Sequence, residues 1–179
     1  MHGLVSLLPK PYYERVEALW NKLVRNHGLR GIRVTPYPHF SWQIASDYDF
    51  DAISLVMDEI AKTTEPLLAR TGGVAIFSGP NPVIYISVVK DPKLLKLHTN
   101  IWERTQTIST GLSPYYSPPN WMPHISLAYG DVTKENIGPV MKMLAFQDFN
   151  WEFTIDDLSL IYEPDGETGA LKYQYKLTG

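Results

Sequence analysis

The chain has 179 residues, of which 44% are hydrophobic and 20% charged, and its formal net charge is −3. A chain of this length buries about two-thirds of its surface on folding, so we expect one continuous folded domain. The acidic balance excludes the general attraction that holds basic proteins on long nucleic acids. The absence of cysteine excludes disulfides, zinc–thiolate sites and thiol nucleophiles.

Residues 3–8 predict a short strand, after which Pro9 and Pro11 interrupt the chain. This segment lacks the basic start of a signal peptide, and Pro9 cuts its apolar run short. No stretch reaches the roughly 20 apolar residues that cross a bilayer. We therefore expect a soluble, cytoplasmic protein that does not contact a membrane.

A helix is predicted from about residue 11 to residue 26, because apolar residues recur at helical spacing and Gly28 is suited to end it. After Gly31 the apolar residues recur at every second position, as in a strand. Residues 32–45 predict a strand interrupted by Pro36 and Pro38, with His and Ser on one face and apolar residues on the other.

Asp47 or Asp49 can cap a second helix, which ends before a break at Gly72-Gly73. Residues 73–78 and 83–90 then predict the two strands of a hairpin.

Asp91-Pro92 is expected to open a third helix, and residues 111–120 form a loop rich in Pro, Ser and Tyr. A second strand with alternating His and Ser follows, and Asp131 or Thr133 is expected to cap a fourth helix.

The tail predicts another hairpin. Its apolar residues change parity between residues 151 and 162, which indicates a bulge near Asp156-Asp157. A turn at Asp165-Gly166 would then lead into a last strand, residues 170–177.

The order strand, helix, His strand, helix, strand occurs twice, in residues 3–78 and again in residues 83–162. Pro38-His39-Phe40-Ser41-Trp42 matches Pro123-His124-Ile125-Ser126-Leu127 as Pro-His-apolar-Ser-apolar. We therefore predict a single bilobal domain over residues 1–179, with internal repeats of about 1–80 and 81–179.

The His-x-Ser spacing places an imidazole and a hydroxyl on the same face of a strand, about 7 Å apart. Two halves related by a pseudo-two-fold would present His39 and Ser41 to His124 and Ser126 across a shared cleft. Two imidazoles can then remove one proton and supply another during cleavage of a phosphodiester, while the hydroxyls bind its free oxygens. Which histidine is the acid and which the base stays open.

With these two motifs, the chain resembles the 2H phosphoesterase superfamily, which includes bacterial 2′-5′ RNA ligase-like proteins and cyclic nucleotide phosphodiesterases. Its signature of two His-x-Ser/Thr-apolar motifs reads here as His39-Phe40-Ser41-Trp42 and His124-Ile125-Ser126-Leu127. The resemblance implies an α+β fold of two antiparallel sheets flanked by helices around a central cleft. It also implies His39 and His124 as catalytic acid and base, and Ser41 and Ser126 as phosphate ligands.

Other chemistries lack their signatures. There is no His-Glu-x-x-His, His-x-His or Cys for a metal, no Gly-x-Ser-x-Gly elbow, no phosphate loop and no dinucleotide fingerprint. We expect neither a metal nor a cofactor. The structural alternatives are that the two motif histidines only stabilise strand ends and that the serines are ordinary polar strand positions.

Four aromatic residues near the motifs could stack on a base or could simply pack: Tyr37, Tyr115, Tyr116 and Trp121. His98 lies at helical spacing from apolar residues, so we interpret it as a core or boundary histidine. Arg33 and Lys172 are possible cationic helpers for the phosphate, and the sequence does not rank them.

The first hypothesis is therefore a metal-independent phosphodiesterase that opens a 2′,3′-cyclic phosphate or cleaves a 2′-5′ linkage. The alternative is a nucleotide or RNA-end binding module with little catalytic activity. Either protein would bind a small nucleotide or an RNA terminus, not a long duplex, and we expect a monomer.

Overall fold

The computed structural model describes residues 1–163 and 167–179, so the predicted turn at Asp165-Gly166 lies outside the described residues. The described helices are α1 (Tyr12–His27), α2 (Phe50–Lys62), α3 (Pro92–Thr105) and α4 (Ile137–Leu144), with short 3₁₀ helices η1 (Gly31–Val34) and η2 (Pro114–Tyr116). The described strands are β1 (His2–Leu7), β2 (His39–Ala45), β3 (Asp47–Tyr48), β4 (Leu67–Phe77), β5 (Val83–Val88), β6 (Ser109–Thr110), β7 (His124–Ala128), β8 (Glu152–Ile155), β9 (Asp157–Tyr162) and β10 (Ala170–Lys176).

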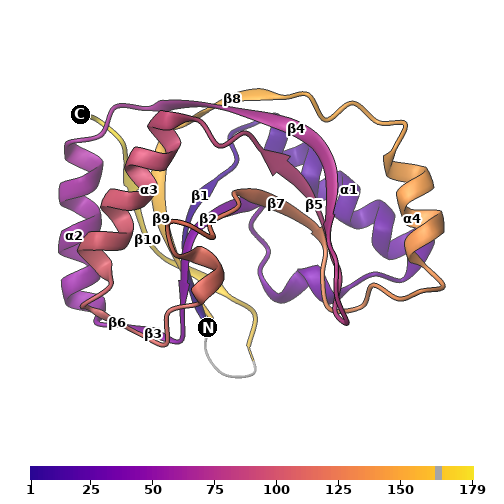
Figure 1. Cartoon of the computed structure of the whole chain (residues 1–179), viewed down its shortest axis with the longest axis horizontal. Coiled ribbons are helices and arrows are strands. Elements are labelled where there is room, and N and C mark those ends of the chain that lie inside the picture. The colour runs from indigo at the N-terminus through magenta and orange to yellow at the C-terminus, as the bar shows by residue number, and fades with distance from the viewer. Residues whose placement is uncertain (164–166) are drawn as a thin grey trace.

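Two four-stranded antiparallel sheets form the framework of the molecule (Figure 1). The first sheet has the order β10-β9-β1-β2, and the second has the order β7-β5-β4-β8. Strands β2 and β7, which carry the two His-x-Ser motifs, are edge strands of their sheets and contact each other. The predicted α+β fold with helix-flanked antiparallel sheets is confirmed.

Helices cover the two sheets separately. In Figure 1, α2 and α3 lie together beside the first sheet, and α1 and α4 lie at the opposite end, beside the second. The apolar stripe of α1 is buried as its spacing predicts, and Gly28 ends that helix in the left-handed conformation (φ 71°). Asp49 and Asp91 cap α2 and α3 by accepting backbone N–H groups at 3.0 and 2.9 Å.

The two halves of the sequence interlock. The first sheet combines β1 and β2 with β9 and β10, which come from the far end of the chain. Helix α1, which precedes the first motif, packs on β7 of the second motif, and α3, which precedes the second motif, contacts β2. A boundary near residue 80 therefore does not separate the two lobes, and duplication of the chain stays a prediction.

The tail differs from the predicted bulged hairpin. Strand β8 pairs with β4 in the second sheet, whereas β9 pairs with β1 and β10 in the first. Asp156, between them, is where the chain leaves one sheet for the other, so the change of apolar parity marks a crossing between sheets.

Three other predicted boundaries were wrong. The first motif strand begins at His39 and not at residue 32, because Pro36 and Pro38 cannot donate to a strand ladder and η1 occupies residues 31–34. The strand predicted from residue 73 begins at Leu67, and Gly72-Gly73 lies at a register shift within it. Helix α4 begins at Ile137 after Asn136, and neither predicted cap is its N-cap.

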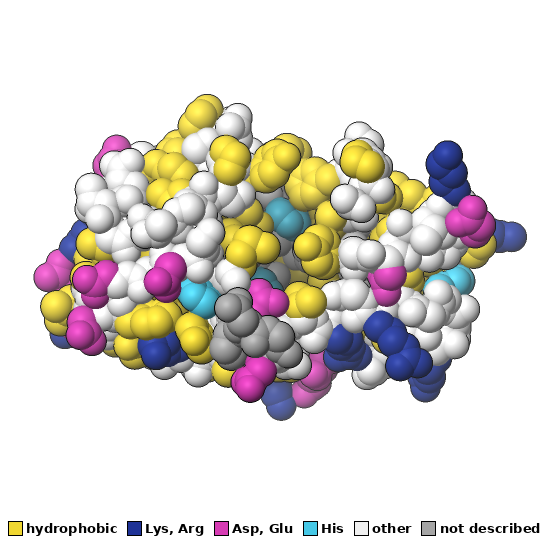
Figure 2. Space-filling view, turned by 90° about the horizontal axis from the view of Figure 1, so that it is seen from below, with side chains coloured by type: hydrophobic (Ala, Val, Ile, Leu, Met, Phe, Trp, Pro, Cys, Tyr) yellow, Lys and Arg dark blue, Asp and Glu magenta, His cyan; other side chains and the backbone are white. Residues whose placement is uncertain are grey.

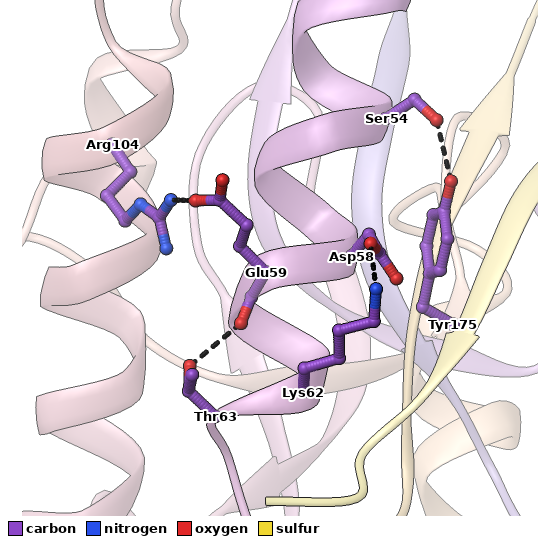
Figure 3. A network of polar contacts seen from close by, with 7 residues as sticks. All are labelled: Ser54, Asp58, Glu59, Lys62, Thr63, Arg104 and Tyr175. Carbon is purple, nitrogen blue, oxygen red and sulfur yellow. Dashed lines mark hydrogen bonds and ion pairs between the residues drawn. The ribbon is translucent and has the colours of Figure 1, made fainter.

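Polar contacts join α2 to its neighbours on the outer side of the first sheet (Figure 3). Glu59 of α2 binds Arg104 of α3, and the Ser54 hydroxyl is 2.6 Å from that of Tyr175 on β10. Glu59 is exposed and the other three residues are partly exposed, so these contacts add little beside the apolar layer beneath them.

Within the described ranges, no helix has both the length and the apolar character that a membrane span requires.

Candidate active site

His39 and His124 occupy equivalent places in the two sheets. Each is the first residue of an edge strand: His39 is opposite Leu7 in the β1–β2 pair, and His124 is opposite Ser87 in the β5–β7 pair. The contact between β2 and β7 brings the two motifs together. Figure 2 shows histidine side chains set back in a hollow in the middle of one face, ringed by hydrophobic side chains, with lysines and arginines nearer the margins.

The two imidazole rings are held in the same way. The Nδ1 atom of His39 is 2.5 Å from the carbonyl oxygen of Tyr37, and Nδ1 of His124 is 2.7 Å from that of Met122. A carbonyl oxygen only accepts hydrogen bonds, so each Nδ1 carries the proton. In the neutral ring Nε2 is then unprotonated and can act as a base.

A proline makes this contact possible in both motifs. The carbonyl oxygen of Pro38 accepts the N–H of Leu8, and that of Pro123 accepts the N–H of Val88, both at 3.0 Å. The proline is thereby fixed to the neighbouring strand, and the residue before it is restricted to extended geometry. The preceding carbonyl is thus positioned beside the histidine ring two residues later.

Both rings favour the neutral state. Burial among protein atoms lowers the pKa of His39 to about 4; the hydrogen bond to Tyr37 acts in the opposite direction, and the charge of His124 acts in the same direction as burial. Burial also lowers the pKa of His124, although its hydrogen bond to Met122 acts in the opposite direction. The effect of the His124 charge on His39 indicates that the two rings lie within electrostatic range of each other.

Two aromatic residues support the His124 ring. Phe77 on β4 and Tyr85 on β5 meet its edge, with ring centroids 4.9 and 5.2 Å away, and stack on each other at 4.0 Å. The sequence interpretation missed both residues. The alternation of residues along β5 could have predicted that Tyr85 lies on the other face of the strand from the apolar Ile84 and Ile86. Only the pairing of β5 with β7 shows that the Tyr85 face meets His124.

Each motif serine is followed directly by a β-bulge, at the same position in the two motifs. The β1–β2 register skips Trp42, and the β5–β7 register skips Leu127, so each strand bulges directly after its serine. Ser41 is 8% exposed, and Ser126 is partly exposed. Trp42 is fully buried and donates its indole N–H to the Ser6 hydroxyl at 2.8 Å, so this bulky residue belongs to the core.

The candidate base-stacking residues differ in exposure. Tyr115 is 79% exposed, while Tyr37 and Tyr116 are partly exposed. Burial raises the pKa of Tyr116 to about 12, although a hydrogen bond with Ser41 acts in the opposite direction, which places this phenol beside the motif serine. Trp121 is fully buried, so its prediction as a base-stacking residue was wrong: the closed core leaves no face for a base.

The remaining candidates have other contacts. His98 is buried, as expected, and its Nε2 is 3.0 Å from the carbonyl oxygen of Tyr116. Arg33 lies over the Trp20 ring and donates to Asn21, and Lys172 lies over the Phe50 ring, so both cations are engaged with other groups. In the part of the chain that the structure describes, no three His, Asp or Glu side chains form a metal-binding group.

Comparison with known proteins places the chain in a family. A family model described as the 2′-5′ RNA ligase superfamily matches residues 9–167. A protein of Bacillus cereus (strain B4264) named "Putative phosphoesterase" is 26% identical over 175 residues, which cover 98% of this chain and 95% of that protein.

Solved structures share the fold. TT0787 of Thermus thermophilus superposes with a TM-score of 0.70 at 16% identity, covering 98% of this chain and 97% of that one. E. coli LigT complexed with 3′-AMP superposes with a TM-score of 0.58 at 14% identity, covering 99% of this chain and 97% of that one. The fold is therefore that of the LigT-like α+β proteins. The chain belongs to the 2′-5′ RNA ligase superfamily, whose model covers most of its length.

Proposed function

We propose that the protein is a metal-independent phosphodiesterase that hydrolyses a 2′,3′-cyclic phosphate or a 2′-5′ linkage in a nucleotide or at an RNA end. His39 and His124 are its acid–base pair. The observation that carries the proposal is the matched pair of rings, each tethered through Nδ1 to the carbonyl two residues earlier, which leaves both Nε2 atoms for proton transfer.

The chemistry needs one neutral and one protonated imidazole. The neutral ring takes a proton from water as the water oxygen bonds to phosphorus. The protonated ring gives its proton to the ribose oxygen as the bond from that oxygen to phosphorus breaks. A cyclic diester thereby becomes a phosphate monoester. The substrate's negative charge raises the pKa of a nearby imidazole, which favours the singly protonated pair.

Hydroxyl groups bind the phosphate in this mechanism. Ser41 and Ser126 are two residues from the histidines on the same strand faces, and their hydroxyls would donate to the non-bridging oxygens. Tyr116, beside Ser41, supplies a further phenol. These neutral donors suit a singly charged diester, whose developing charge they stabilise without a fixed cation.

A small nucleotide is the ligand class that we favour. LigT has been solved with 3′-AMP and with ATP, and it shares this fold. The net charge of −3 argues against a long duplex. Tyr37 and Tyr115 keep exposed surface near the motifs and are the candidates to stack on a base.

The test is turnover in the presence of EDTA on a panel of 2′,3′-cyclic nucleotides, short 2′-5′ oligoadenylates and cyclic oligonucleotides. His39→Ala and His124→Ala should each abolish turnover, whereas His27→Ala, at the far end of α1, should retain it. A folded motif variant with full activity would refute the acid–base assignment. A wild-type protein that binds these ligands without forming products would support the binding-module alternative.

A further inference from the structure

Two tryptophans hold the backbone of the motif serines. The indole Nε1–H of Trp121 donates to the carbonyl oxygen of Ser41, and that of Trp20 donates to the carbonyl oxygen of Ser126, each at 3.0 Å. Trp121 is fully buried, and Trp20 is 2% exposed. Two bonds of the same type and length thus end on the same atom of the two motifs.

These carbonyls lie where the sheets support the backbone least. Each motif strand pairs with one neighbour only, β2 with β1 and β7 with β5, in the described sheets. The ladder is also interrupted directly after each serine, where Trp42 and Leu127 are skipped. At a bulge the peptide plane has fewer ladder hydrogen bonds to fix its direction, so a buried external donor there sets it.

We propose that Trp20 and Trp121 are positioning residues: their indole N–H groups fix the peptide planes that follow Ser126 and Ser41, so that each serine hydroxyl is directed at the substrate phosphate. The proposal rests on the proposed phosphodiesterase function. Neither indole needs to touch the substrate, because each acts through the serine whose carbonyl it binds.

We call the two indole–carbonyl hydrogen bonds, Trp20 to Ser126 and Trp121 to Ser41, the clamps. Each clamp joins a tryptophan from one half of the chain to the motif of the other half. Trp20 comes from α1, which precedes the first motif, but it holds the second motif; Trp121 precedes the second motif and holds the first. His98 of α3 backs the second clamp, since its ring lies parallel to Trp121 at 4.0 Å, with an interplanar angle of 10°. Each half thus completes the serine site of the other, so a correct site forms only when both halves are docked.

The experiment replaces each indole by a ring without the N–H group. Trp20→Phe and Trp121→Phe should each lower kcat on a 2′,3′-cyclic nucleotide about tenfold, the effect of one lost hydrogen bond, with KM changed by less than about threefold. Trp151→Phe is the matched control. Its indole also donates to a backbone carbonyl at 3.0 Å, that of Asp148, so it loses the same kind of bond away from the motifs and should keep full kcat.

A double-mutant cycle separates positioning from general loss of stability. Trp121→Phe should have no further effect on kcat in a Ser41→Ala background, but should keep its full effect in a Ser126→Ala background. Trp20→Phe should show the reverse pattern. Equal effects in both backgrounds, or unchanged kcat in both single variants, would overturn the proposal.

Failure of the proposed function gives a different result. If the wild-type protein turns over none of the substrates, the two clamps can still be tested without a substrate. The measurement is then amide hydrogen exchange in residues 41–45 and 126–128. Each Trp→Phe variant should then accelerate exchange in the segment that it holds, and Trp151→Phe in neither. Unchanged exchange in both segments would overturn the clamps independently of the reaction.

Discussion

The stability of the protein at acid pH is expected to depend on His98, which packs behind the candidate active site. Its ring is 1% exposed, stacks on Trp121, and binds the carbonyl oxygen of Tyr116. Burial lowers its pKa to about 4, and the positive charge of Lys90 acts in the same direction. The unfolded chain therefore binds a proton at His98 more readily than the folded protein as the pH falls below about 6.5.

The size of the effect follows from the two pKa values. Above pH 6.5 both states are neutral at this ring, and its contribution to stability is fully present. As the pH falls toward 4, that contribution is lost. With a folded pKa of about 4 against about 6.5 unfolded, the loss between pH 7.5 and 5.0 is about 2 kcal/mol. For a chain of this length that corresponds to roughly 4–8 °C in Tm.

The assay is urea unfolding of wild type, His98→Gln and His98→Phe between pH 7.5 and 5.0. Both variants should be less stable than wild type at pH 7.5, because Gln loses the stack on Trp121 and Phe loses the hydrogen bond to the carbonyl oxygen of Tyr116. That difference should shrink by about 2 kcal/mol at pH 5.0, since only wild type has the titrating ring. The free energy of unfolding should depend on pH in the same way in both variants, although their side chains differ in shape. A stability difference that is independent of pH would refute the linkage.

Three further predictions concern the site and its supports. The pKa values of both motif histidines are lowered, and the reaction needs one ring neutral and one protonated, so kcat/KM should peak below pH 6.5; a maximum above pH 7 would contradict the shared burial. Tyr116→Phe should lower kcat severalfold in steady-state kinetics with little change in Tm, because its phenol lies beside Ser41, and unchanged kcat would remove it from the site. Gly31→Ala should destabilise by about 2 kcal/mol or more in urea titration, since its Cβ would collide with the carbonyl of Tyr129, whereas Gly138→Ala, with open space and a helical position, should be neutral or stabilising.

Local signals predicted the parts of the fold that depend on neighbouring residues. The cap at Asp91, the stop at Gly28 and the apolar faces of the helices were evident, and the cap of α2 was narrowed to Asp47 or Asp49, because capping and helical periodicity act within one or two turns. Predictions went wrong where distant segments meet. The parity change near Asp156 was visible, but its cause, a crossing from one sheet to the other, depends on strand pairing across the whole chain.

The same division applies to the candidate site. The sequence by itself determined the two Pro-His-x-Ser-apolar strands, because a period of two fixes which side chains share a face. Only the tertiary structure decided that the motif strands are adjacent edges, that each imidazole is tethered through Nδ1, and that Trp121 is buried with its indole N–H donated to the carbonyl oxygen of Ser41. Edge position, burial and the partner of an indole N–H arise from contacts between residues far apart in the chain, which no local pattern records.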